Sequence, residues 1–429
     1  MLKAGFARLD ITPPLGTPLA GYQRPRYAND VLDPIEVNAI ALNDGEKTLI
    51  MIAADVEGMD VADAKHIKKL IFDRLGIPAE YVVVSALHQH TTYIMRHKVI
   101  ENLTPAFAEV VYSKFCDVTQ MAIQDMSDAE LSCGECETAE KLAFVRRYIL
   151  KDGKTVTNPT PKQIPEIDRR CAEADNTVRL LRFTRKDKKD IALVNFCTHP
   201  DVVHGEKVSA DWPGFTRRFV EADNSDISCL VFVGPEGDSN HLDHIGGIKN
   251  GYEHSIHMGR VIADAVKKIW DNTIPQNCDK ISADVQIVYT KSNNEGEEKY
   301  DECKAFLEAR ENGTLGYNPE IEEVAYARRV VMIRESMTIY HPLPVTAVTL
   351  GDVVIVGLGG EPFTEYGASI RAAAGGRFAL AFALTNGHQG YLPSDKAFLE
   401  GGYEARGSRF SAGLQDQVIS KVKEMLDLT

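Results

Sequence analysis

The chain has 429 residues, 44% of them hydrophobic and 26% charged, which is typical of a globular protein rather than a disordered or membrane-embedded one. Its formal net charge of −14 and the lack of a dense Lys/Arg block argue against a nucleic-acid partner, because the phosphate backbone selects basic surfaces. No apolar run approaches the roughly 18 residues of a membrane-spanning helix, so we expect no stable membrane insertion. The first residues lack the apolar core of a signal peptide, which predicts a cytoplasmic protein.

The eight cysteines are spread along the chain and do not form the dense pattern of a disulfide scaffold. Cys133 and Cys136 have the spacing of a metal-binding pair, but no second pair follows at zinc-finger spacing. We therefore do not interpret this pair as a metal or redox site. The sequence contains no feature that predicts an oligomeric state.

Periodicity and turn residues predict alternating strands and helices along the chain. Strands are expected over 37–42 and 48–54 around an Asn-Asp-Gly turn, a helix over 61–75 ending at Gly76, and a strand over 81–86. Farther along, we expect helices over 104–126, 254–270 and 414–426, and buried strands over 191–197, 229–233, 353–357 and 378–384. The polar segment 297–336 is expected to be mostly helical.

These elements predict an α/β fold in which mixed β-sheets are flanked by helices and the active site lies at the C-terminal ends of strands. With no internal repeat and no low-complexity linker, residues 1–429 are interpreted as one catalytic domain. Segment 297–336 is the candidate for a helical insertion in it.

Five of the apolar segments run into short loops rich in glycine, histidine and acids. These loops carry, in chain order, His88 with His90, then His199, Asp238 with Asn240, Glu361, and Tyr391. If the strands share one sheet, the loops converge, because ligands of α/β proteins gather at the carboxyl ends of strands. An extended backbone would also point His88 and His90 to one face.

The residue types in these loops favour a catalytic metal. Imidazole and carboxylate are the usual zinc ligands, and a catalytic zinc keeps an open position. Zinc lowers the pKa of its bound water to about 7, which supplies hydroxide for attack on a carbonyl.

Each residue also has a simpler interpretation. A lone His-x-His pair is weak evidence, His199 could simply end a strand, and Tyr391 could be a packed aromatic. Glu361 could cap a helix that begins near Phe363, because acids favour helix N-termini. Only the recurrence of the pattern at successive strand ends favours a metal site.

The ordered set of motifs resembles the catalytic domain of the neutral/alkaline ceramidase family over nearly the whole chain. The motifs that carry the resemblance are residues 5–14 with Leu19-Ala20-Gly21-Tyr22, His88-x-His90, His199 with Ser209-Ala210-Asp211-Trp212-x-Gly214, Gly237-Asp238, Gly360-Glu361, Gly390-Tyr391 and Tyr403-Glu404.

The resemblance implies a Zn²⁺ ion held by His88, His199, Glu361 and Tyr391. It also implies that His90 assists at the substrate carbonyl, with Arg146 and Tyr403 stabilising the oxyanion. We further expect the pocket to be lined by His204, His241, His244 and His388.

Two departures from the family pattern affect the expected chemistry and substrate. Thr91-Thr92-Tyr93 replaces the family's Ser-Gly-Pro, which changes the local substrate wall. Asn240 stands at the position of the functional serine unless Ser239 shifts into its place, so the metal-hydroxide route is favoured over a serine-dependent step. The family's C-terminal β-sandwich domain is also absent from this sequence.

The resulting hypothesis is a zinc-dependent amidohydrolase that cleaves an N-acyl bond and acts on a smaller, more soluble compound than the two-chain lipid ceramide. The alternatives are an ester or lactone hydrolase on the same scaffold and a catalytically silent binding protein. Metal analysis separates the silent alternative from the others.

Overall fold

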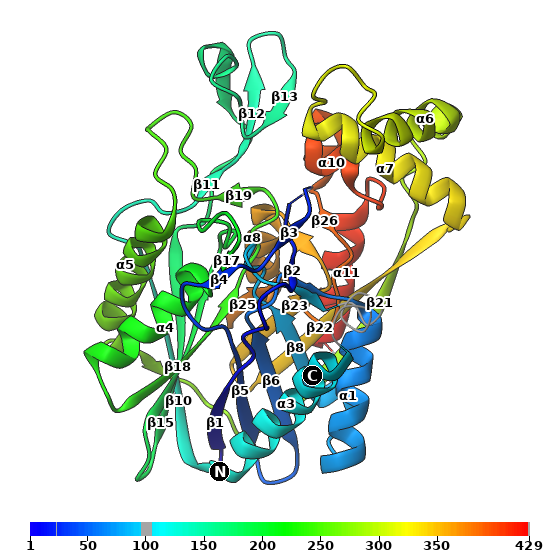
Figure 1. Ribbon diagram of the computed structural model, residues 1–429. Helices are drawn as coiled ribbons and strands as arrows, with labels where there is room; N and C mark the ends of the chain where they lie inside the picture. The colour runs from blue at the N-terminus through cyan, green and yellow to red at the C-terminus, as the bar shows by residue number, and fades with distance from the viewer. Residues whose placement is uncertain (23, 96–104, 428–429) are drawn as a thin grey trace.

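The computed structural model describes residues 1–22, 24–95 and 105–427. In this part of the chain the largest element is a nine-stranded mixed sheet with the main order β18-β16-β15-β10-β1-β5-β6-β8, and β20 pairs with β10 at the side (Figure 1). Its strands are β1 (Lys3–Asp10), β5 (Glu36–Asn43), β6 (Thr48–Ala54), β8 (Val82–Ala86), β10 (Ser127–Glu137), β15 (Thr177–Arg185), β16 (Asp190–Phe196), β18 (Ile227–Val233) and β20 (Ile274–Pro275).

A second sheet has the order β21-β22-β23-β25. Its strands are β21 (Ile281–Lys291), β22 (Tyr340–Leu350), β23 (Val353–Leu358) and β25 (Phe378–Phe382). The two sheets pack face to face through one apolar cluster, in which alternate residues of β5 and β6 meet residues of β22, β23 and β25. The stacked rings of Phe232 and Phe382, 4.2 Å apart, join the sheets near the ends of β18 and β25.

Helices cover the outer faces of both sheets (Figure 1). The other set of alternate residues of β5 and β6 packs against α1 (Val61–Leu75) and α3 (Pro105–Gln124). On the second sheet, the outer face packs against α8 (Thr364–Ala373) and α11 (Leu414–Asp427). The helices α4 (Asp211–Asp223) and α5 (Tyr252–Trp270) pack against β18, β15 and β10. This layering confirms the predicted α/β class with mixed sheets flanked by helices.

Most of the expected elements are present with small shifts at their ends. Helix α1 covers the predicted residues 61–75 and ends at Gly76, whose φ of 73° lets its N–H bond to Phe72. Helix α3 occupies the segment expected to be helical over 104–126, of which Thr104 lies outside the described residues. The strands β1, β10, β15, β21 and β22 and the helix α4 were not expected from the sequence.

Segment 297–336 is mostly helical, as expected, and contains α6 (Tyr300–Glu311) and α7 (Ile321–Ser336). Helix α7 packs on the short helix α10 (Tyr403–Gly407), which begins with the predicted active-site tyrosine. Figure 1 shows these helices at the top of the molecule, near a hairpin formed by β12 (Arg147–Leu150) and β13 (Thr155–Thr157).

The five predicted strand ends do meet, but they belong to two sheets rather than one. β8 and β18 lie at opposite ends of the large sheet. They are brought together by the chain that continues from β25, because Ala383 donates its N–H to Val233 at 3.0 Å and Asn386 donates to Val84 at 2.7 Å. The assumption of a single sheet was therefore wrong, while the expected convergence is present.

None of the described helices combines the length and the apolar character needed to cross a membrane.

The cysteine pair on β10 is split between the two faces of the strand. Cys133 is buried, and Cys136 lies three residues farther along, with its Sγ near the carbonyl of Ala265 on α5. Residues three apart on a strand point to opposite faces, so this arrangement is unsuited to a shared metal.

Candidate metal centre

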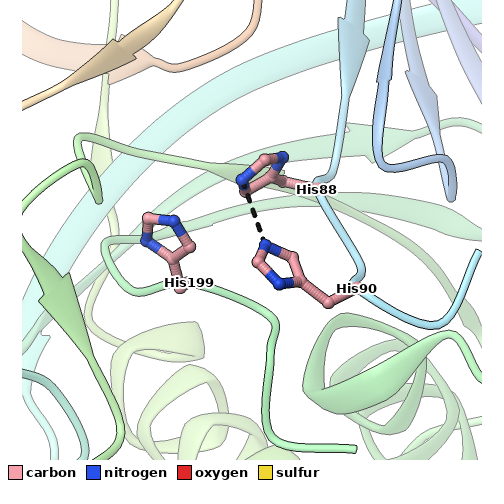
Figure 2. A group of neighbouring side chains, drawn as sticks. All are labelled: His88, His90 and His199. Atoms are coloured by element: carbon pink, nitrogen blue, oxygen red, sulfur yellow. Dashed lines mark hydrogen bonds between the residues drawn. The ribbon is translucent and has the colours of Figure 1, made fainter. Parts of the chain in front are cut away.

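His88 and His90 lie in the loop that follows β8, and their imidazoles meet (Figure 2). Their Nε2 atoms are 3.3 Å apart. His88 has a φ of 68°, so the backbone is in the left-handed region rather than extended. The expected convergence of the pair is therefore correct, but the extended-strand reason given for it was wrong.

Backbone carbonyls fix the orientation of two histidines. The Nδ1 atom of His88 lies 2.6 Å from the carbonyl of Glu57, and that of His199 lies 2.8 Å from the carbonyl of Glu236. An N–H at Nδ1 that donates to a carbonyl leaves the lone pair on Nε2. This arrangement is typical of metal-ligating histidines.

Glu361 completes a three-atom cluster with these two histidines. Its Oε2 lies 3.5 Å from His88 Nε2 and 3.3 Å from His199 Nε2. Ligand atoms about 2.0–2.1 Å from one tetrahedral ion are about 3.3–3.4 Å apart, so the observed separations fit an ion between them. In the described part of the chain, Oε2 has no hydrogen-bond partner, while Oε1 accepts from His388 Nε2 at 2.9 Å.

Glu361 is not a helix cap, which was its simpler interpretation. The backbone N–H and the hydroxyl of Thr364, at the start of α8, both donate to Asp238 Oδ1 at 2.8 Å. Asp238 therefore caps this helix, and the Glu361 carboxylate turns instead to three histidines.

Tyr391 lies beside Glu361, because β24 (Glu361–Pro362) and β26 (Tyr391–Leu392) pair in parallel with these two residues in register. Its hydroxyl accepts a hydrogen bond of 3.1 Å from Arg146 Nη2, and its ring lies 5.4 Å from that of Tyr403. Burial and then the charge of Glu361 hold the pKa of Tyr391 well above its usual range. Tyr391 thus adjoins the cluster and is not merely a packed aromatic.

Arg146 is held in place by several acceptors. Its Nε donates to Glu404 Oε1 at 2.8 Å, and its Nη2 also donates to the carbonyl of Gly237 at 3.0 Å. The buried ion pair with Glu404 fixes the guanidinium next to the two tyrosines. Arg146, Tyr391 and Tyr403 thus form one group of donors beside the histidine–glutamate cluster.

The charges in the cluster are strongly coupled. Burial lowers the pKa of His88, but the carboxylate of Glu361 outweighs burial and raises it to about 10. Burial raises the pKa of Glu361, but the charge of His88 and the hydrogen bond from His388 outweigh it and hold this pKa well below its usual range. Burial and the neighbouring His88 lower the pKa of His90 well below its usual value.

Asn240, at the position of the family's serine, faces away from the histidines. Its Nδ2 donates to Asn158 Oδ1 at 3.1 Å, and its Oδ1 accepts from the N–H of Leu242 at 3.0 Å. The neighbouring Ser239 donates its hydroxyl to the carbonyl of Cys197 at 3.4 Å. None of these hydrogen bonds connects the side chain of Asn240 or Ser239 to Glu361.

The four histidines expected to line the pocket occupy different places. His388 contacts Glu361 directly. His241 contacts other residues than the metal cluster: its Nδ1 lies 3.2 Å from Asp201 Oδ1 and its Nε2 lies 3.0 Å from Asn250 Oδ1. His204 contacts the hydroxyl of Tyr22 at 2.6 Å, and His244 lies near Asn158 and the ring of Tyr148.

Glu236 was not singled out in the sequence, although it belongs to the site. Its side chain is 0% exposed, and both carboxylate oxygens lack a hydrogen-bond partner in the described part of the chain. One ligand atom each from His88, Glu236 and Glu361 lie within 4.8 Å of one another, as do those of His88, His90 and His199. The available signal was its position in the Gly-Pro-Glu-Gly loop directly after a buried strand. These buried imidazoles and carboxylates can hold a metal ion.

Comparisons with known proteins agree with this description. No protein-family model and no curated protein sequence matches the chain. The neutral ceramidase from Pseudomonas aeruginosa superposes with a TM-score of 0.73 at 13% identity, covering 100% of this chain and 75% of that chain. A ceramidase complexed with C2 gives the same TM-score and coverage at 12% identity. Such a likeness shows the fold, and it confirms at that level the resemblance seen in the sequence. The chain therefore has the fold of neutral ceramidase.

Proposed function

We propose that this protein is a zinc-dependent hydrolase that cleaves an amide (N-acyl) bond. The observation that carries the proposal is the convergence of His88 Nε2, His199 Nε2 and Glu361 Oε2 at distances that fit one ion. Tyr391 adjoins this cluster and is proposed as the remaining ligand. The fold shared with neutral ceramidase supports an amide as the bond that is cleaved.

A zinc ion in this cluster would supply a Lewis acid that lowers the pKa of a coordinated water to about 7. The protein itself supplies positioned donors. Arg146 and the hydroxyls of Tyr391 and Tyr403 form a fixed group beside the cluster, suited to the negative charge that develops on a carbonyl oxygen. His90, whose Nε2 lies 3.3 Å from His88 Nε2, is proposed to assist at the substrate carbonyl. Asn240 donates a hydrogen bond to Asn158, and no nucleophilic role is proposed for it.

The surroundings of Tyr403 favour a small polar substrate over a two-chain lipid. A cavity of about 130 Å³ reaches this residue, and Asn158, Gln163, Glu320 and Glu322 are among the residues that line it. The start of α7 thus brings two acidic residues to this cavity. The net charge of −14 would also oppose approach to an anionic lipid surface. We propose that ceramide is a poor substrate and that residues 1–429 act as one catalytic unit.

The test is hydrolysis of a matched panel by the zinc-loaded protein. The panel pairs short N-acyl amino acids with the corresponding esters and lactones, and adds short-chain and long-chain ceramide. We expect turnover of the short amides, lost in His88→Ala and kept in His257→Ala, an exposed histidine that pairs with Glu140.

Turnover of esters or lactones alone would favour the alternative hydrolase on this scaffold. Rapid hydrolysis of long-chain ceramide, lost in His88→Ala, would contradict the substrate proposal. Purified protein that binds no divalent metal would contradict the hydrolase itself.

A further inference from the structure

Glu236 lies in the loop between β18 and β19 (Ser239–Asn240), which the backbone holds against Glu361. Gly237 donates its N–H to the carbonyl of Pro362 at 2.9 Å. A Cβ atom on Gly237 would lie 2.3 Å from the carbonyl oxygen of Glu361, so only glycine permits this approach. The preceding residue, Glu236, is thereby fixed next to the metal cluster.

The carboxyl group of Glu236 is buried without a hydrogen-bond partner among the described residues. Both of its oxygens lack a hydrogen-bond partner among the described residues, and the side chain is 0% exposed. The guanidinium of Arg146 donates its hydrogen bonds to Glu404, Gly237 and Tyr391 rather than to Glu236. An unpaired buried carboxylate costs several kcal/mol, so such a group is paired with a cation, binds a metal or takes up a proton.

Glu236 shares its neighbours with the proposed ion. Its carboxylate belongs to a group with His88 and Glu361 in which all three ligand atoms lie within 4.8 Å. His88 is also a member of the group with His90 and His199, and Glu361 Oε2 lies 3.5 Å from His88 Nε2 and 3.3 Å from His199 Nε2, so both members that Glu236 adjoins face the proposed ion. An ion seated between His88, His199 and Glu361 is therefore within reach of Glu236.

We propose that Glu236 is a further ligand of the metal ion, an inference that rests on the proposed metal-dependent function. The donor set then contains two imidazoles and two carboxylates, with Tyr391 adjoining it. The two carboxylate charges balance those of a divalent cation, which accounts for the burial of Glu236 without a hydrogen-bond partner among the described residues.

The rival explanation is a protonated glutamic acid that takes no part in metal binding. The variant Glu236→Gln separates the two, because glutamine matches a protonated carboxyl in shape but lacks a carboxylate charge. Glu57→Gln is the matched control. Glu57 is also buried, and its Oε2 has no hydrogen-bond partner among the described residues, but it belongs to neither ligand group. The substitution keeps the backbone carbonyl of residue 57, which accepts the hydrogen bond from His88.

The measurement is the affinity for Zn²⁺ and Co²⁺ by chelator competition, together with the visible spectrum of the Co²⁺ form. Loss of a residue that only supports a ligand costs about 10–100-fold in affinity, so loss of a ligand is expected to exceed about 100-fold. We expect this loss and a changed Co²⁺ spectrum in Glu236→Gln, with Glu57→Gln within about tenfold of the wild type. Wild-type affinity and spectrum in Glu236→Gln would overturn the inference and leave the proposed function standing, whereas a wild type that binds no metal would overturn both.

A direct measurement covers the case in which Glu236→Gln does not fold. The anomalous signal of cobalt in crystals of the loaded wild-type protein locates the ion relative to the carboxylate. A Glu236 oxygen at about 2.0–2.2 Å from the ion supports the inference, and separation beyond about 3 Å overturns it.

Discussion

The side-chain amide of Gln89, the residue between His88 and His90, donates a hydrogen bond of 2.7 Å to Asp55 Oδ1. Asp55 follows β6 and is held in turn by Arg217, with hydrogen bonds of 3.0 and 2.5 Å. Both charged groups of this ion pair are 0% exposed. The loop that carries two of the site histidines is thus anchored to a buried ion pair between the end of β6 and helix α4.

The first prediction concerns this anchor. Replacing Arg217 with Met leaves the Asp55 carboxylate buried without its cation, and breaking a buried pair in this way costs about 3–5 kcal/mol. We expect the free energy of unfolding, measured in urea, to fall by that amount in Arg217→Met.

Arg260→Met is the control, because Arg260 pairs with Asp223 where both side chains are partly exposed. Pairs at the surface contribute at most about 1 kcal/mol. Equal losses of stability in the two variants would show that the Asp55–Arg217 pair has no special role.

The second prediction concerns metal removal. A ligand that binds only the folded state stabilises it, by about 2.7 kcal/mol at a concentration 100 times its Kd. We therefore expect the melting temperature of the zinc-loaded protein to fall when a strong chelator is added. His199→Ala should show no such chelator effect, because it removes one of the two histidine ligands.

His257→Ala serves as the control for the histidine substitution, since this side chain is exposed and pairs with Glu140. It should keep the chelator-dependent shift of the wild type. A shift that persists in His199→Ala would place the ion elsewhere in the protein.

Much of the site could be predicted because apolar strand segments and the loops that follow them are visible in sequence. His88, His199 and Glu361 stood out because they follow such strands, and the resemblance to the ceramidase family selected them as metal ligands. The pairing of β8, β18 and the end of β25 could not be predicted, because it depends on contacts between distant segments. The left-handed backbone conformation of His88 could not be predicted from the sequence either, because it is imposed by the surrounding fold rather than by residue type.

Glu236 shows a different limit of sequence reasoning. An acid after a buried strand is more often a loop residue at the surface, and only its 0% exposure and its unpartnered oxygens reveal its place in the site. Asn240 is the converse case. Its position in a motif indicated a catalytic role, while its side chain bonds to Asn158 and not to the histidine cluster.

The third prediction concerns the dependence of stability on pH. Burial, followed by the charge of Arg409, lowers the pKa of His341 on β22 to about 4. Its buried Nε2 has no hydrogen-bond partner in the described part of the chain. A histidine with a depressed pKa stabilises the fold above its unfolded pKa of about 6.5, and this contribution is lost as the pH falls toward 4. The expected loss is on the order of 1–3 kcal/mol.

In His341→Gln the contribution of residue 341 to the pH dependence of the unfolding free energy should disappear, because glutamine does not titrate. The check is a set of urea-unfolding curves for both proteins between pH 4 and pH 8. The difference in unfolding free energy between wild type and variant should shift in favour of the variant as the pH falls below about 6.5. A difference that is constant across this range would show that His341 does not titrate in the folded protein as expected.

The last prediction concerns Arg146, which joins the donors on one side of the cluster. Its guanidinium bonds at once to Glu404, to the carbonyl of Gly237 and to the hydroxyl of Tyr391. A lysine keeps the charge but lacks the planar fork needed for these contacts. On the substrate identified by the panel, we expect Arg146→Lys to lower kcat by about 10²–10³-fold, the usual effect of removing one oxyanion donor, with KM and zinc content near those of the wild type.

Arg147→Lys is the matched control, because Arg147 bonds to Glu400 and to the carbonyl of Gly401 and not to Tyr391. A comparable loss of kcat in both variants, or loss of zinc from Arg146→Lys, would mean that Arg146 supports the structure of the site and does not act on the developing charge.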